Sequence, residues 1–195
     1  DWAPVSGGLD THRLLQARYP KAPCHVIEPT PARAQIARRA LSAPWWKRLF
    51  QPSLLCFDTP EPASADMLWA NMALHLSADP QTLIAQWHDA LDVDGFLMFS
   101  CLGPDTLREL RGLYQSLGWP PAGCDFTDMH DWGDMLVAAG FAEPVMDMER
   151  ITLTFASPQR LLQELRSLGR NLNLARFGGL RGRQWHAQLQ SQLVS

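Results

Sequence analysis

The segment 66–111 holds two short apolar runs with an amphipathic stretch between them. The runs cover residues 67–70 and 96–101, and Asn71 follows the first of them. The stretch between them places apolar side chains on one helical face, namely Leu83, Ile84, Trp87 and Leu91. A strand, a helix and a second strand in this order predict parallel strands joined by a crossover. Functional groups in such sheets gather at the carboxyl ends of the strands.

Three more apolar runs predict strands at residues 24–28, 53–57 and 145–155. The last of these alternates apolar and polar positions, as expected for a strand with one buried face. Asp1 and Trp2 are interpreted as the end of a further strand, and residues 1–8 as the loop that follows it. We therefore expect the full protein to continue on both sides of the given sequence.

Helical spacing predicts five further helices, and most of their ends carry capping or breaking residues. The first covers residues 9–19, with Leu14 and Leu15 facing inward. The second starts at Thr30 and Pro31, a favoured cap and first residue. A third is expected to open at 103–105. The inward face of the second helix is defined by Ile36, Ala37 and Ala40. The fourth helix has Trp132, Met135 and Leu136 on its inward face and ends at Gly140. The fifth has Leu161, Leu162, Leu165 and Leu168 and ends at Gly169.

This alternation of strands and helices predicts an α/β fold with a doubly wound, mostly parallel, Rossmann-like sheet. The sequence shows no internal repeat and no linker long enough to separate two domains. We expect one domain over residues 1–195, with a ligand-binding half at 1–117 and a covering half at 118–195. The first and last strands of the sheet are expected to lie outside the given chain.

Composition narrows the function classes only slightly. The chain has 195 residues, 46% of them hydrophobic, and a net charge of −3, which gives no general attraction to nucleic acid. No apolar run approaches the roughly 20 residues that a membrane-spanning helix needs. The four cysteines form no CxxC pair and the six histidines show no metal-ligand spacing, so no metal site is expected. A cytoplasmic protein is the expectation.

Polar residues at the ends of successive predicted strands indicate a nucleoside site. Glu28 ends one strand and is placed to accept both hydroxyls of a ribose. Asp58 ends the next and could bind an adenine amino group, and Asn71 follows the strand after that. Each acid could instead cap a helix or lie solvated in a loop.

Three further features carry alternatives. His75 lies just after Asn71, near the place where a second substrate would bind, whereas the other histidines are interpreted as surface or partly buried residues. The residues at 45–48, WWKR, could dock an acidic carrier protein or simply cover the sheet edge. The arginines of the C-terminal tail could be solvated or could meet the same carrier; they are Arg176, Arg181 and Arg183.

Three stretches carry a resemblance to a known family. They read LWANMALHL, LDVDGFLMFSCLGPDTLREL and FTDMHDWGDMLVAAGFAEPVMDMERITLTF. Over residues 19–180 the chain resembles the malonyl-acyl-carrier-protein O-methyltransferases of biotin synthesis, which are class I S-adenosylmethionine-dependent methyltransferases. The resemblance implies a seven-stranded sheet, with the methyl donor across the carboxyl ends of the first four strands. It also implies a free carboxylate of a malonyl thioester as the methyl acceptor.

The resemblance implies roles for particular residues. Asp1 corresponds to the acid that ends the first strand, Glu28 to the ribose-binding acid and Asp58 to the adenine-side acid. Gly7 belongs to the donor loop, and Asn71 lies beside the methionine moiety of the donor. On the acceptor side the corresponding residues are Asp105, Thr106 and Arg108 in one turn, and His130 and Asp131 in the cover over the acceptor pocket. Arg108 and Arg111 are the candidates to orient the acceptor carboxylate.

The donor loop departs from the family pattern DxGxGxG. The corresponding positions here are Asp1, Ala3, Val5 and Gly7. Glycine serves in such loops because the backbone needs unusual angles and must approach the ligand closely. Val5 places a stiff, branched side chain where the carboxypropyl group of the donor would pass.

Three hypotheses follow. The first is an S-adenosylmethionine-dependent methyltransferase that methylates a carboxylate, with acyl-carrier protein as a partner. The second is a protein of the same fold that has lost donor binding and serves as an assembly or interaction factor, which Ala3 and Val5 motivate. The third is a different reaction on this fold, because a mitochondrial assembly factor similar to the family hydroxylates arginine.

Overall fold

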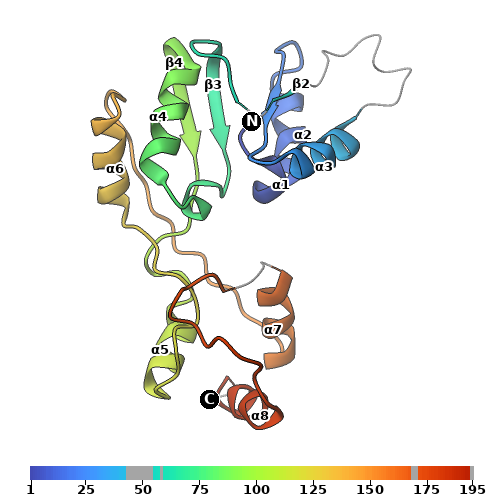
Figure 1. Cartoon of the computed structure of the whole chain (residues 1–195), viewed down its shortest axis with the longest axis vertical. Coiled ribbons are helices and arrows are strands. Elements are labelled where there is room, and N and C mark those ends of the chain that lie inside the picture. The colour runs from blue at the N-terminus through green and yellow to red at the C-terminus, as the bar shows by residue number, and fades with distance from the viewer. Residues whose placement is uncertain (43–54, 58, 168–170, 194–195) are drawn as a thin grey trace. The chain divides into compact units, whose positions relative to one another are not determined.

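Two pairs of parallel strands form the centre of the N-terminal part of the chain (Figure 1). β1 (His25–Ile27) pairs with β2 (Leu55–Phe57), and β3 (Ala65–Ala70) pairs with β4 (Leu91–Phe99). α4 (Pro80–Ala90) connects β3 to β4, so the predicted strand–helix–strand crossover is confirmed.

Residues 1–3 lie between the two strand pairs and link them. On one side, Ala3 N–H donates to the Ile27 carbonyl over 2.8 Å, and Ile27 N–H donates to the Asp1 carbonyl over 3.0 Å. On the other side, Trp2 N–H donates to the Trp69 carbonyl over 2.7 Å. Successive residues of an extended chain direct their backbone groups to opposite sides, which explains this alternation. The resulting order is β2, β1, residues 1–3, β3, β4, so the interpretation of Asp1 and Trp2 as the end of a strand is confirmed.

A computed structural model describes residues 1–42, 55–57, 59–167 and 171–193. These residues fall into two compact units. Unit 1 comprises Asp1–Leu102 and Met129–Met146, and unit 2 comprises Gly103–Asp128 and Asp147–Ser195. The prediction of a single domain, with halves at 1–117 and 118–195, stays a prediction.

Two helices of unit 1, α3 (Pro31–Leu41) and α4, begin where the sequence places caps. Thr30 Oγ1 accepts the Arg33 N–H at the start of α3, and Asp79 Oδ1 accepts the Thr82 N–H at the start of α4. A proline follows each cap, as expected at a first helical position. The helical elements of the unit are α1 (Pro4–Gly7), α2 (Leu9–Arg18), α3 (Pro31–Leu41), η1 (Leu74–Leu76), α4 and α6 (Met129–Ala138).

The core of unit 1 lies between α4, α6 and the strands. Trp87 is fully buried and meets Trp2 edge-on, with 6.0 Å between the ring centroids. Ile84 from α4 and Trp132 and Leu136 from α6 belong to the same cluster. Truncating a buried tryptophan such as Trp87 to alanine costs about 3–5 kcal/mol, so this cluster contributes strongly to the stability of the unit.

Unit 2 contains α5 (Arg108–Ser116), α7 (Pro158–Ser167) and α8 (Arg183–Gln192). Its centre is an aromatic cluster in which Trp119 lies 5.2 Å from Tyr114 and 5.2 Å from Trp185, between ring centroids. α7 turns its half-buried leucines to one side, as predicted for Leu161, Leu162 and Leu165, while Leu168 and Gly169 lie outside the described residues.

The predicted strand at 145–155 is wrong. These residues form no strand, and most of their apolar side chains are exposed: Val145 at 93%, Ile151 at 72% and Leu153 at 69%. Alternation of apolar and polar residues stabilises a strand only where a neighbouring strand accepts and donates the backbone hydrogen bonds. No strand among the described residues pairs with this segment.

Several predicted details are corrected. Residues 4–7 form a short helical turn, where a loop was predicted. Leu14 is 70% exposed because α2 buries His12 on the opposite face. Ile36 and Ala40 are exposed because the neighbouring residues Ala34 and Ala37 form the inner face of α3. Two boundaries also differ: Leu91 starts β4, and the helix expected at 103–105 begins at Arg108, after Leu107 in a left-handed conformation.

Candidate functional site

Glu28 lies at the carboxyl end of β1, as predicted, and is fully buried. Its Oε1 accepts a hydrogen bond of 2.8 Å from the backbone N–H of Val5, in the turn Pro4–Gly7. Its Oε2 is buried and has no hydrogen-bond partner among the described residues. Burial raises the pKa of the Glu28 carboxyl, and the Val5 hydrogen bond and the charge of Arg33 oppose that rise.

Asn71 follows the carboxyl end of β3 and joins three segments. Its Nδ2 donates to the Gly7 carbonyl, and its Oδ1 accepts a 2.7 Å hydrogen bond from the Ser100 hydroxyl after β4. A Cβ on Gly7 would lie 2.0 Å from the Asn71 carbonyl oxygen, so only glycine fits against this strand end. Gly7, Glu28 and Asn71 therefore gather along one edge, around the turn Pro4–Gly7.

Asp1 ends its strand but does not face the turn. Its Oδ2 lies 2.8 Å from Nδ1 of His12 on α2, and both side chains are almost completely buried. Cys24 Sγ lies 3.8 Å from the same ring nitrogen. The sequence reasoning missed His12. Its spacing could have indicated that it is buried, because Leu9, His12 and Leu15 share one helical face at intervals of three residues.

The two predicted histidines occupy different environments in unit 1. His75 lies in η1, where its Nδ1 accepts the Leu102 N–H over 3.4 Å, and burial lowers its pKa. The neutral imidazole is therefore favoured there. His130 lies in the first turn of α6 and lines an open cavity of about 360 Å³ together with Met129, Val137 and Met146.

The remaining acceptor-side candidates lie mostly in unit 2. Arg108 pairs with its neighbour Glu109 over 3.1 Å, and its side chain is 56% exposed. Arg111 is more fully engaged, since it donates to the Pro104 carbonyl and to Asp125, both over 2.7 Å. Asp105 pairs with Arg150. Thr106 N–H donates to the Gly103 carbonyl over 3.0 Å, which holds the turn before α5.

Two predicted features lie outside the described residues, and one acceptor-side candidate lies in unit 1. Asp58 and residues 45–48 lie outside the described residues. Asp131 is an exposed residue of α6 in unit 1. Within the described part of the chain, no group of three or more His, Cys, Asp or Glu side chains could hold a metal ion. The described helices include none that is long and apolar enough to cross a membrane.

The geometry at the strand ends suits a nucleoside in one respect. The buried, unpaired Oε2 of Glu28 is an acceptor that a ribose hydroxyl would satisfy. The turn Pro4–Gly7 covers this carboxylate, however, and supplies the Val5 N–H to its other oxygen. A ligand that replaces the Val5 N–H at Oε1 requires the turn to move. Left-handed Ala3 (φ 51°) and Gly8 (φ 100°) flank the turn on its two sides.

Similarity to a solved structure defines the class of the fold. The chain aligns with a chain from the complex between the Haloferax volcanii Trm112 methyltransferase activator and a methyltransferase, with a TM-score of 0.55 and 17% identity. The alignment covers 87% of this chain and 77% of that one. Together with the parallel strands and their order, this confirms a Rossmann-like fold of the class I methyltransferases. No protein-family model matches the chain.

Within that class, the chain is similar to proteins named malonyl-[acyl-carrier protein] O-methyltransferase. It is 41% identical over 179 residues to the protein of that name from Laribacter hongkongensis, across 88% of this chain and 60% of the relative. It is 40% identical over 185 residues to the protein of the same name from Gallionella capsiferriformans, across 91% of this chain and 63% of that relative. The predicted resemblance is thereby confirmed, and the chain spans about 60% of the length of these relatives.

Proposed function

We propose that this protein is an S-adenosylmethionine-dependent methyltransferase that esterifies the free carboxylate of malonyl-acyl-carrier protein in biotin synthesis. The observation that carries the proposal is the similarity over most of the chain to enzymes of that name, at 41% identity with the Laribacter protein. The carboxylate of Glu28 at the end of β1 supports it, since this is the position from which a Rossmann-like sheet binds ribose.

The donor would be held by residues at the strand ends of unit 1. Glu28 Oε2 would accept a ribose hydroxyl, and Asn71 and Gly7 would border the methionine part. Asp1 would act indirectly, because its carboxylate faces His12 and holds α2 against the sheet. Asp58 is proposed for the adenine side. When bound, the donor supplies a methyl group on a sulfonium, which is electrophilic without further activation.

The acceptor needs little acid–base assistance from the protein. A malonyl carboxylate is already ionised at neutral pH, so the protein has to orient it rather than deprotonate it. Arg108 is the proposed residue for this task, because its side chain is more than half exposed and its ion-pair partner among the described residues is a surface neighbour, Glu109. Arg111 is already bound to Pro104 and Asp125.

The two histidines are proposed to shape the acceptor side. His75, whose burial favours the neutral imidazole, adds no positive charge near the strand ends. His130 lines an open cavity with methionine and valine side chains, which suits the apolar part of an acyl thioester. Acyl-carrier protein is the proposed partner.

Methyl transfer by the full-length protein tests this function. Purified protein would be incubated with S-adenosylmethionine and malonyl-acyl-carrier protein, and the carrier analysed by intact mass spectrometry. We expect the carrier mass to rise by one methylene unit. Acetyl-acyl-carrier protein, which has no free carboxylate, is the control and should keep its mass. An unchanged carrier, under conditions where the Laribacter relative methylates it, would refute the proposal.

One observation favours a second function, that of a fold relative that no longer binds the donor. Val5 N–H already satisfies Glu28 Oε1, and Ala3 and Val5 occupy positions where the related pattern has glycine. On this reading the turn Pro4–Gly7 is a permanent part of the fold, and the protein serves as an interaction factor.

Calorimetry with the full-length protein separates the two. The first function requires S-adenosylmethionine to bind and Glu28→Ala to weaken it by about a hundredfold, as loss of charge-assisted hydrogen bonds to two hydroxyls predicts. Glu61→Ala, an exposed acid of the same unit, serves as the control. Absence of donor binding, together with capture of a specific protein partner, would support the second function.

A further inference from the structure

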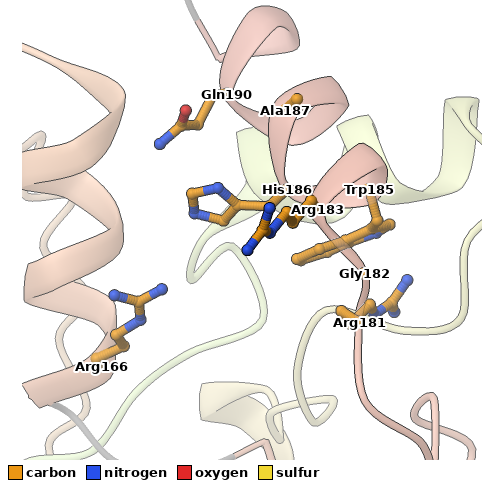
Figure 2. Close-up of a pocket in the computed structure, with 8 residues that line it drawn as sticks. All are labelled: Arg166, Arg181, Gly182, Arg183, Trp185, His186, Ala187 and Gln190. Atoms are coloured by element: carbon orange, nitrogen blue, oxygen red, sulfur yellow. The ribbon is translucent and has the colours of Figure 1, made fainter.

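Unit 2 contains a cavity whose lining is strongly basic and has no part in the proposed transfer site. It has a volume of about 370 Å³ and lies between α7 and the start of α8 (Figure 2). Arg166 comes from α7, Arg181 from the segment before α8, and Arg183, His186 and Gln190 from α8 itself. The described residues that line it include no acid, so their polar groups are cations, hydrogen-bond donors and one amide.

The arginines of this cavity lack acidic partners within the described part of the chain. No described carboxylate lies within ion-pair distance of Arg166, Arg181 or Arg183, whereas Arg13, Arg108, Arg111 and Arg150 each have one. Guanidinium groups that share one space repel each other, and an anion among them would relieve that repulsion. This arrangement points to an anionic ligand.

Arg181 and Trp185 form one wall of the cavity. The guanidinium of Arg181 stacks 4.4 Å from the centroid of the Trp185 ring and 4.6 Å from that of Phe177. Trp185 in turn packs against Trp119, which ties this wall to the aromatic cluster of the unit. These contacts hold the half-buried indole of Trp185 beside the cations.

The start of α8 adds hydrogen-bond donors to the same space. Gly182 is the N-cap of this ten-residue helix and has no side chain to cap the first N–H groups. Together with the cations, these N–H groups suit a tetrahedral oxyanion with several acceptor oxygens. Figure 2 shows Arg166 extending from α7 towards α8, and His186 and Gln190 extending from α8 into the space between them.

We propose that this cavity binds the phosphate group of an organic phosphate ester. Arg166 and Arg183 supply the charge, His186, Gln190 and the first turn of α8 supply further hydrogen bonds, and Trp185 contacts the organic part. Two arginines match the two negative charges of a phosphomonoester better than the single charge of a carboxylate or a phosphodiester. The site is independent of the methyl-transfer function proposed above.

Isothermal titration of the full-length protein with phenyl phosphate tests the site. We expect binding that weakens with added salt, and a loss of affinity of about tenfold or more in the double variant R166A/R183A, since two charge-assisted contacts disappear. Arg160→Ala is the matched control, because Arg160 lies on the same helix α7 but outside the cavity, and it should leave the affinity within about twofold.

Two further measurements define the ligand class more closely and distinguish lost contacts from a misfolded variant. Inorganic phosphate should bind more weakly than phenyl phosphate if Trp185 contacts the organic part, and diphenyl phosphate should bind more weakly than the dianionic monoester. The variant R166K/R183K retains the charge and should retain part of the affinity at an unchanged melting temperature. No binding of phenyl phosphate at low salt, or equal binding by wild type and R166A/R183A, would overturn the proposal.

Discussion

The backbone N–H of Val5 donates a 2.8 Å hydrogen bond to the carboxylate of Glu28, across 23 residues of sequence. This bond joins the turn Pro4–Gly7 to the end of β1 and buries the carboxylate. It satisfies Oε1, while Oε2 is buried and has no partner in the part of the chain that the structure describes. A nucleoside that binds Glu28 with two hydroxyls would therefore compete with the turn for the same acceptor, so donor affinity and turn stability should be linked.

Replacing Glu28 by glutamine should make the protein less sensitive to pH. Because burial raises the pKa of Glu28, the native state binds this proton more tightly than the unfolded state does. Wild-type stability should therefore fall as the pH rises from the ordinary carboxyl pKa through the raised native value. Each unit of that rise corresponds to about 1.4 kcal/mol above the window.

Urea denaturation at several pH values between about 4 and 8 measures this effect. The free energy of unfolding of E28Q relative to wild type should increase across the window and then level off. E61Q, which changes an exposed carboxyl, is the control and should follow wild type. A constant difference in unfolding free energy between E28Q and wild type at every pH would contradict a raised pKa of Glu28 as the cause.

Gly7→Ala should destabilise unit 1. Its Cβ would lie 2.0 Å from the Asn71 carbonyl oxygen, and both partners are backbone, so neither can move away cheaply. We expect a loss of about 1–3 kcal/mol from this overpacking, measured by chemical denaturation. Gly112→Ala is the matched control: Gly112 lies inside α5 with nothing within 4 Å of an added Cβ. Gly112→Ala should instead stabilise the protein by about 0.5–1 kcal/mol. Equal effects of the two substitutions would refute the close contact between Gly7 and Asn71.

His12→Phe should be among the most costly single changes in unit 1. It would leave the Asp1 carboxylate buried without its 2.8 Å partner, at a cost of about 3–5 kcal/mol in thermal or urea unfolding. The comparison is Arg13→Ala one residue later, which breaks an exposed pair with Asp10 and should cost less than about 1 kcal/mol. Similar costs for both would show that the Asp1–His12 pair is not held as described.

Protonation of His75 should weaken the fold. Burial lowers its pKa, so the native state binds this proton less tightly than the unfolded state does. The stability of the wild type should be unaffected above the ordinary histidine pKa of about 6.5 and should fall as the pH drops below it. His75→Asn should lack this component, and NMR titration of the imidazole provides an independent measurement. A native pKa at or above the ordinary value would contradict the prediction.

Arg108 offers a test of the acceptor side. If its guanidinium orients the malonyl carboxylate, Arg108→Ala should lower kcat/KM by roughly tenfold to a hundredfold, since poor alignment raises the barrier. Arg108→Lys should recover part of the rate, because it keeps the charge but loses the fork. Arg160→Ala, which removes an exposed arginine elsewhere in unit 2, is the control. An Arg108→Ala enzyme with unchanged kcat/KM would remove this residue from the mechanism.

Local sequence patterns were sufficient for most elements of unit 1. Thr30 with Pro31 and Asp79 with Pro80 mark two helix starts, and continuous apolar runs mark β1 and β3, because caps and runs act over a few neighbouring residues. The same reasoning failed at 145–155, because a strand depends on a partner that lies far away in sequence. It also mistook the inner faces of α2 and α3, where spacing alone does not say which of two apolar faces meets the sheet.

The sequence by itself determined the fold class, the family resemblance and the presence of polar residues at the strand ends, since these depend on residue types and their order. Only the tertiary structure decided what those residues touch. The packing buries His12 against Asp1 and places the Asn71 side chain so that it donates to the Gly7 carbonyl. It also places the Val5 N–H so that it donates to one oxygen of Glu28. Such pairs form between residues 11 to 64 positions apart, and their geometry follows from the packing of whole elements.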